Sequence, residues 1–243
     1  MNQLLIYQSP LALNRGAHRQ VRLQPGPLGF AFARELNSVP LTTAEFSAAA
    51  RDYPIVFAGE GEDVSLPAAL LGLAANDNLH VDESGEWLAD RYVPAFIRRY
   101  PFVSAEVDDA EGFTVCIDQP ALTEADDGVR LFDDEGENTP VLNHAIDFLS
   151  TYQQNVTQTQ AFMKQLRDSG LLEAKTIRVE RDGQEPQVLR GFSVVNEERL
   201  QKLPGKALAA LSKTGALGLL YVHLMSLSNV QRLAARADAI RRQ

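Results

Sequence analysis

One long helical pattern constrains the fold of this chain more than any other feature. From Val141 onwards, apolar residues recur at about every 3.6 positions, the spacing that places them on one face of a helix. They are Val141, Leu142, Ala145, Leu149, Tyr152, Val156, Met163 and Leu166. Thr139-Pro140 is typical of a helix start, and Ser169-Gly170 of a helix end. The pattern predicts one helix of about 30 residues, roughly 45 Å long. The alternative is a helix with a break between residues 155 and 159.

Before this helix, the chain alternates between strand patterns and turns. The segment Phe113–Ile117 alternates as a strand does and is rich in strong strand formers. The predicted strands cover residues 21–23, 55–57, 79–81, 113–117 and 131–132. Turn residues after 79–81 and after 131–132 predict hairpins. Short helices are predicted after the capping box Thr42-x-x-Glu45 and at residues 67–73 and 92–99.

After the long helix, one hairpin is followed by further helices. Residues 177–180 and 187–189 flank Asp182-Gly183, and Asp-Gly between two strands is the strongest hairpin signal in the chain. Helices are predicted over residues 196–204, 206–213 and 216–240. Hairpin signals outnumber parallel βαβ patterns, so the predicted fold class is α+β. We expect an antiparallel sheet built from hairpins in the N-terminal and middle parts, and long helices in the C-terminal half.

The length of 243 residues is compatible with one large domain or two small ones. We expect a single domain over residues 1–243. The alternative is a division into a strand-rich part, 1–138, and a helix-rich part, 139–243.

Two short sequence patterns each occur twice. Arg-x-Tyr-Pro, followed by an apolar residue and Val, begins at Arg51 and at Arg98, each time at a predicted helix-to-strand junction. Asp-x-x-Gly-Glu begins at Asp82 and at Asp133, each time in a predicted turn. Two short matches favour repeated use of the same turn chemistry over an internal duplication.

Acidic residues are concentrated in one segment. Residues 104–138 contain twelve acidic residues and one basic residue, Arg130, whereas the whole chain has a net charge of −9. Such a segment repels phosphate backbones, so we expect no nucleic-acid partner. Residues 133–138 lack the ligand spacing of an EF-hand loop, and a solvated turn is the favoured interpretation. Whether segment 104–138 binds a cation stays open at this point.

The sequence favours the cytoplasm. Cys116 is the only cysteine, so no internal disulfide can form, which is typical of a reducing compartment. The first residues have no basic region ahead of an apolar run, so we expect no signal peptide, although export without such a signal stays open. The longest apolar run, 216–227, is about half of the roughly 20 residues that a membrane span needs. We therefore expect a buried helix and no membrane span.

No familiar catalytic, metal or cofactor motif is present. The four histidines are scattered, without an i, i+4 partner or a nearby cysteine, so no metal site is predicted. Neither a nucleophile elbow nor a phosphate-binding glycine loop occurs, and no cofactor is predicted. Cys116 lies in a strand-like apolar run, which is typical of a buried and unreactive thiol. We therefore predict no catalytic residues.

The densest group of aromatic and basic residues is the stretch Trp87–Phe102. Its arginines and tyrosines could hold an anionic ligand, or an acidic or aromatic segment of a partner. The alternative is that the aromatics form the core and the arginines pair with the local acidic excess. The candidate binding residues are Arg91, Tyr92, Arg98, Arg99, Tyr100 and, from the C-terminal apolar run, His223.

The chain resembles the bacterial SapC family over nearly its whole length. The matching segments are short, but they occur in a specific order and spacing. They include Tyr53-Pro54-Ile55-Val56-Phe57, Tyr92-Val93-Pro94-Ala95-Phe96-Ile97-Arg98-Arg99-Tyr100-Pro101-Phe102, Leu131-Phe132-Asp133-x-x-Gly136-Glu137 and Leu217-Gly218-Leu219-Leu220-Tyr221-Val222-His223-Leu224. The resemblance implies an association with surface layers, from which the family takes its name. It also implies gene neighbours such as TonB-dependent receptors, flavin-dependent tryptophan halogenases and cupin-like oxygenases.

Three functional hypotheses follow. The first is a non-catalytic accessory protein that binds a protein or peptide partner through residues 87–102, and that is linked to nutrient uptake or to peptide or tryptophan modification. The second is a surface-layer-associated or secretion-linked protein. The third is an enzyme of unrecognised type, in which Arg98, Tyr100 and His223 would converge on one pocket, because catalytic groups must reach the same substrate.

Overall fold

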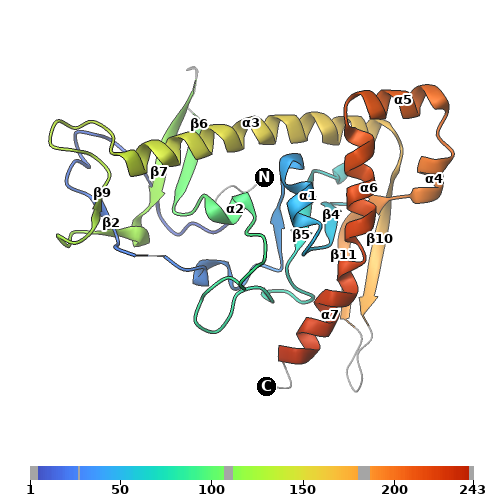
Figure 1. The fold of residues 1–243 in the computed structure, drawn as a ribbon, viewed down its shortest axis with the longest axis horizontal. Helices are drawn as coiled ribbons and strands as arrows, with labels where there is room; N and C mark the ends of the chain where they lie inside the picture. Colours follow the sequence, from blue (N-terminus) through green and yellow to red (C-terminus); the bar gives the residue numbers. More distant parts are fainter. Residues whose placement is uncertain (1–4, 27, 107–111, 180–186, 241–243) are drawn as a thin grey trace.

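The structure is a computed structural model that describes residues 5–26, 28–106, 112–179 and 187–240. Three antiparallel sheets, with five, three and three strands, combine with helices. Figure 1 shows the small sheets at one end, the large sheet at the other, and one long helix running past both. The α+β prediction is confirmed.

The large sheet lies in the order β10-β11-β4-β5-β3. Its strands are β3 (Ser38–Pro40), β4 (Ile55–Ala58), β5 (Leu66–Leu70), β10 (Leu172–Val179) and β11 (Gln187–Val195). The two long strands β10 and β11 pair antiparallel, as a hairpin at Asp182-Gly183 predicts, although that turn lies outside the described residues. Strand β11 then pairs with β4, so the hairpin extends the sheet that the N-terminal half begins.

The two small sheets lie at the opposite end of the molecule (Figure 1). The first has the order β1-β7-β6 and contains β1 (Pro10–Ala12), β6 (Phe102–Glu106) and β7 (Phe113–Asp118). The second has the order β8-β2-β9 and contains β2 (Arg22–Leu23), β8 (Leu122–Thr123) and β9 (Val129–Arg130). The strands predicted at 21–23 and 113–117 are therefore confirmed within a residue of their ends.

The long helix α3 (Pro140–Asp168) has 29 residues and no break. A polar stretch near Thr159 does not interrupt it. The Thr159 hydroxyl donates to the Asn155 carbonyl one turn earlier (2.7 Å). The same hydroxyl oxygen accepts the Thr43 backbone N–H at 2.9 Å. The prediction of one continuous helix is confirmed, and its centre is fixed to the N-terminal half of the chain.

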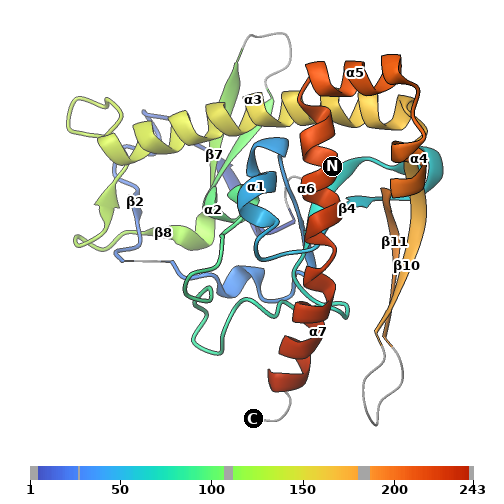
Figure 2. The same cartoon turned by 45° about the vertical axis from the view of Figure 1, so that its right-hand side comes forward.

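Four helices follow the large sheet: α4 (Glu197–Gln201), α5 (Gly205–Lys213), α6 (Ala216–Ser226) and α7 (Asn229–Ile240). Figure 2 shows α6 and α7 in line across the large sheet, with α5 turned sharply away above them. The predicted helix over 216–240 is therefore present, with a turn at Leu227-Ser228. Among the described helices, no single one is both long and apolar enough to cross a membrane; α5 taken together with Ala216–Ile240, at a bend of 90°, passes on length and composition alone.

Residues 67–73 were expected to form a short helix, and that expectation is wrong. They contribute most of β5, which pairs with β3 on one side and β4 on the other. Four of its five residues are buried. A short apolar run that is buried on both faces has no periodicity by which to distinguish a strand from a helix. The two flanking strands decide its structure.

Several other short elements are smaller than predicted. The capping box at Thr42 begins a 3-10 turn, Thr43–Glu45, which continues into α1 (Phe46–Ala49). The helix predicted over 92–99 is the four-residue α2 (Ala95–Arg98), which starts after Pro94. The strands predicted at 79–81 and 131–132 are reduced to single bridges, Val81 with Trp87 and Phe132 with Asn138.

The two Asp-x-x-Gly-Glu patterns form the same turn. In each, the aspartate Oδ1 accepts the backbone N–H groups two and four residues later, at 2.8–3.0 Å. The glycine of each turn has a positive φ, +87° at Gly85 and +84° at Gly136, which a side chain would strain. Repeated turn chemistry therefore explains this recurrence. The Asp133 carboxylate is held by its own turn within the acidic segment.

The largest cluster of buried side chains includes residues from Ile6 to Leu220, and so from both sides of position 138. Phe46, Tyr53, Phe57 and Phe96 are among its most completely buried members. The single domain over 1–243 remains a prediction.

Candidate binding site

The buried carboxylate of Glu45 positions α2. Its Oε1 accepts the Ala95 N–H at 2.7 Å and the Tyr92 hydroxyl at 3.0 Å. Its Oε2 accepts the backbone N–H and the hydroxyl of Thr42, at 2.8 and 2.9 Å. Glu45 is only 5% exposed. One carboxylate thus joins the start of α1 to the start of α2.

Arg98 is the exposed cation of α2, and its orientation is fixed. Its Nε donates to the Val93 carbonyl at 3.0 Å, and its Nη2 donates to the Tyr92 hydroxyl at 3.2 Å. Its guanidinium carbon lies 5.3 Å from the centre of the Phe148 ring and 5.7 Å from that of Tyr92. Burial raises the pKa of Tyr92 to about 12, so this hydroxyl keeps its proton. Within the described parts of the chain, no carboxylate pairs with Arg98.

Arg91 holds a loop in place. Its Nη1 pairs with Asp52 Oδ1 at 2.9 Å, and the other Asp52 oxygen accepts the Tyr92 backbone N–H at 3.0 Å. Asp52 is almost completely buried, whereas the Arg91 side chain is 38% exposed. The pair fixes the segment that leads into α2.

Arg99 points into the core. It is 3% exposed, and its guanidinium carbon lies 4.3 Å from the Phe96 ring centre, 5.2 Å from that of Tyr152 and 5.6 Å from that of Tyr7. A cation held over three aromatic faces is stabilised by the ring quadrupoles. The three consecutive candidates 98, 99 and 100 therefore have different surroundings.

Tyr100 is half-buried beside Arg98. Its ring stacks on Phe32, with centroids 4.0 Å apart and planes 24° apart. Its hydroxyl donates to Asp118 Oδ2 at 3.2 Å, while Asp118 Oδ1 accepts the N–H groups of Gln8 and Ser9. Burial, with the Asp118 carboxylate next in effect, raises the pKa of Tyr100 to about 12.

His223 lies apart from these residues, on the side of α6 that is buried in the core. It is fully buried, its Nε2 accepts the Val195 N–H at 3.1 Å, and its Nδ1 lies 2.9 Å from the Ile55 carbonyl. These contacts define the tautomer with the proton on Nδ1. Burial lowers the pKa of His223 to about 4, so the ring is neutral. It joins α6 to β4 and β11, and it lines neither of the grooves described next.

Two open grooves meet at Arg98 and Tyr100. Groove A, of about 480 Å³, is lined by these two residues together with Leu28, Phe30, Phe32 and Glu86. Groove B, of about 250 Å³, lies on the other side and includes Phe102, Val141, Ala145 and Phe148. The structure thus brings Arg98 and Tyr100 together on the surface with aromatic and aliphatic side chains on both sides.

A family comparison agrees with the sequence resemblance. The family model of SapC matches residues 13–233, which is most of the chain. The chain belongs to the SapC family. No curated protein matches it, and no solved structure matches it. The family assignment carries no catalytic residue to this SapC member.

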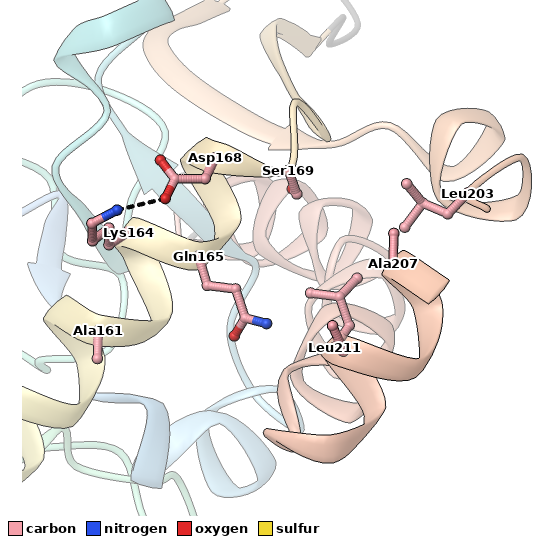
Figure 3. A pocket seen from close by; sticks show the side chains of 9 residues that line it. Ala161, Lys164, Gln165, Asp168, Ser169, Leu203, Ala207 and Leu211 are labelled. Atoms are coloured by element: carbon pink, nitrogen blue, oxygen red, sulfur yellow. Dashed lines mark hydrogen bonds and ion pairs between the residues drawn. The ribbon is translucent and has the colours of Figure 1, made fainter. Parts of the chain in front are cut away.

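A third groove, of about 530 Å³, separates the C-terminal end of α3 from α5. Figure 3 shows Gln165 and the Lys164–Asp168 pair on the α3 side, and Leu203, Ala207 and Leu211 on the other. Lys164 Nζ pairs with Asp168 Oδ2 at 2.6 Å. Lys164 and Asp168 therefore neutralise each other in this groove, whereas Arg98 pairs with no carboxylate among the described residues.

Cys116 and Arg98 differ in the chemistry that they can supply. Burial raises the pKa of the Cys116 thiol, which keeps it protonated and poorly nucleophilic. Among the residues that the structure describes, no three His, Cys, Asp or Glu side chains form a group that could hold a metal ion. Arg98 offers N–H donors and a positive charge beside apolar surface, which suits a carboxylate next to an apolar side chain.

Sequence reasoning missed several residues that shape the site. Phe30 and Phe32 lie within residues 1–40, where the sequence predicts irregular or short-strand structure, and Phe148 was not among the apolar positions used to predict α3. The close spacing of Phe30 and Phe32 was the only feature of the sequence that could have indicated these two residues. Glu45 was identified only as a helix cap, because its contacts with Tyr92 and Ala95 join residues 47 and 50 positions apart.

Proposed function

We propose that this protein is a non-catalytic accessory protein that binds a protein or peptide partner at grooves A and B. The observation that carries the proposal is the fixed guanidinium of Arg98, which lies between two grooves lined mostly by apolar side chains. Its orientation is set before binding by Val93 and Tyr92. A donor held in this way loses little freedom when a ligand binds, which favours affinity.

The partner segment that best fits this surface has a carboxylate next to aromatic or aliphatic side chains. The carboxylate would accept N–H groups of Arg98, and the apolar side chains would enter the grooves beside Phe30 or Phe148. Buried aromatic and arginine anchors contribute most of the affinity of many interfaces. We further propose that the protein acts in the cytoplasm and serves a nutrient-uptake or peptide-modification system.

Arg98→Glu is expected to remove partner binding. The substitution places a negative charge where the partner carboxylate would lie, so we expect an affinity loss of about 30-fold or more, in the range of interface hot spots. The measurement is capture of partners from native cells on immobilised wild-type and variant protein, followed by mass spectrometry and titration of the partner that is found. Arg98 is exposed, so the variant should keep its fold, which circular dichroism checks.

Lys164→Glu is the matched control, because it makes the same change of charge at the groove between α3 and α5. We expect it to retain the partner. A partner that Lys164→Glu loses and Arg98→Glu retains would assign binding to the other groove. Turnover of a substrate by the isolated protein would contradict the non-catalytic part of the proposal.

A further inference from the structure

His80 is a buried histidine whose ring has no polar contact. It is 5% exposed, and within the described residues neither ring nitrogen has a hydrogen-bond partner. Its ring centre lies 4.8 Å from that of Tyr53, edge to face, and 6.2 Å from that of Trp87, nearly parallel. The neutral ring therefore behaves as an aromatic side chain, whereas a protonated ring would be a buried cation without an acceptor.

The charges around His80 oppose its protonation. Arg236 approaches from α7, where its Nε donates to the Leu79 carbonyl, and Arg91 approaches from the segment before α2. Asp52 is the nearby acid, but its two oxygens already hold Arg91 and the Tyr92 N–H. The Tyr53 hydroxyl donates to the Tyr92 carbonyl and accepts from Trp87 Nε1. Each of these neighbouring polar groups thus has another partner.

Trp87 connects His80 to groove A. Its ring meets that of Phe30 edge to face at 5.7 Å, and Phe30 lines the groove. The Phe30 backbone N–H donates to the Gly85 carbonyl at 2.6 Å, in the turn of the same hairpin. The Leu88 N–H closes this hairpin by donating to the His80 carbonyl at 2.9 Å. An outward movement of residues 79–88 would therefore displace a wall of groove A.

We propose that the hairpin formed by residues 79–88 is an acid-sensitive switch, which opens when His80 takes up a proton and thereby reshapes groove A. The effect on a partner rests on the function proposed above, whereas the opening itself does not. The acidic form of the groove would lack Phe30 in its present position, so partner binding would weaken as the pH falls.

The sign of the pH effect follows from burial. Burial, and then the charges of Arg236 and Arg91, lower the pKa of His80 from its ordinary value near 6.5 to about 3 in the closed hairpin. In an open hairpin, the solvated ring would titrate near 6.5. The closed form is therefore fully favoured above pH 6.5. Its ratio to the open form falls by about tenfold for each pH unit below that value, until the pH approaches 3.

Hydrogen exchange of the Leu88 amide measures the opening directly. After correction for the intrinsic pH dependence of exchange, we expect its protection to fall by about 30-fold between pH 7 and pH 5. In His80→Phe, which keeps an aromatic ring against Trp87 and removes the titrating nitrogens, the protection of Leu88 should stay constant. Since Trp87 is the only tryptophan, acrylamide quenching of its fluorescence gives a second reading of the same opening.

Two results would overturn the switch. One is an equal loss of Leu88 protection in wild type and His80→Phe. The other is a Leu88 protection factor as high as that of the Leu70 amide, which is bonded to the Pro54 carbonyl in the large sheet, because the hairpin would then open only with the whole fold. Both comparisons need no partner.

Capture of partners at pH 7 and at pH 5 tests the effect of the switch on binding. Wild type should lose an Arg98-dependent partner at pH 5, and His80→Phe should retain it.

Discussion

Replacing Glu45 by alanine is expected to lower the free energy of unfolding by about 3–5 kcal/mol. The carboxylate accepts four hydrogen bonds while almost completely buried, and its removal leaves donors of Thr42, Tyr92 and Ala95 without an acceptor. Each unsatisfied buried donor costs about 1–3 kcal/mol, and local relaxation recovers part of that sum. Urea denaturation followed by circular dichroism measures the change.

Glu45→Gln separates hydrogen bonding from shape. The amide keeps one acceptor oxygen but turns an NH2 group towards two donors, so we expect a smaller loss, of about 2 kcal/mol. Glu83→Ala removes an exposed glutamate and should change stability by less than about 0.5 kcal/mol. If Glu45→Ala unfolds as easily as Glu83→Ala, then Glu45 does not hold α2 in the way described.

His223→Phe is expected to cost about 2–4 kcal/mol at neutral pH. Phenylalanine fills similar space against Phe57, but it leaves the Val195 N–H and the Ile55 carbonyl without partners in the core. These groups belong to β11 and β4, two adjacent strands of the large sheet. The loss therefore weakens the attachment of α6 to the sheet, and denaturant titration at pH 7.5 measures it.

The cost of His223→Phe should shrink in acid. In wild type, burial lowers the pKa of His223 to about 4, so the unfolded chain takes up a proton below pH 6.5 while the folded chain does not. The contribution of the neutral, buried His223 to the free energy of unfolding is thus complete above pH 6.5 and is lost as the pH falls towards 4. The difference between wild type and variant should narrow by about 1.4 kcal/mol at pH 5.5. A constant difference at both pH values would show that His223 takes up its proton as readily in the folded chain as in the unfolded chain, which contradicts the lowered pKa. Exposed His144→Phe is the control.

The two buried histidines illustrate what the sequence can and cannot predict. His223 was named from the sequence as a binding candidate, although the apolar helix pattern around it also fits a core histidine, and the fold buries it completely. His80 lies in a short strand-like segment, and nothing local indicates that Tyr53, Trp87 and Arg236 meet around it. Tyr53 lies 27 positions before His80 in the chain and Arg236 lies 156 positions after it, and only the fold brings them together.

The same distinction holds for the fold. Helix α3 and the pair of β10 with β11 are predictable because each pattern is long, local and bounded by clear turn residues. Strand β5 was mistaken for a helix because its state depends on β3 and β4, which bind it from both sides. Arg98 and Tyr100 could be selected from the sequence as surface candidates, but the grooves around them are made by Phe30, Phe32 and Phe148, which come from distant segments.

The unbroken length of α3 has a mechanical consequence. Phe148 borders groove B in the N-terminal third of this helix, and Leu166 is buried in the main core near its C-terminal end, 18 residues later. At 1.5 Å per residue, roughly 27 Å of continuous helix separates the two positions. A partner seated in groove B is thus attached to a rigid rod whose far end is anchored in the core. Force applied at groove B would be transmitted along the rod towards the main core, and the 2.9 Å hydrogen bond between Thr43 and Thr159 holds the rod between these two positions.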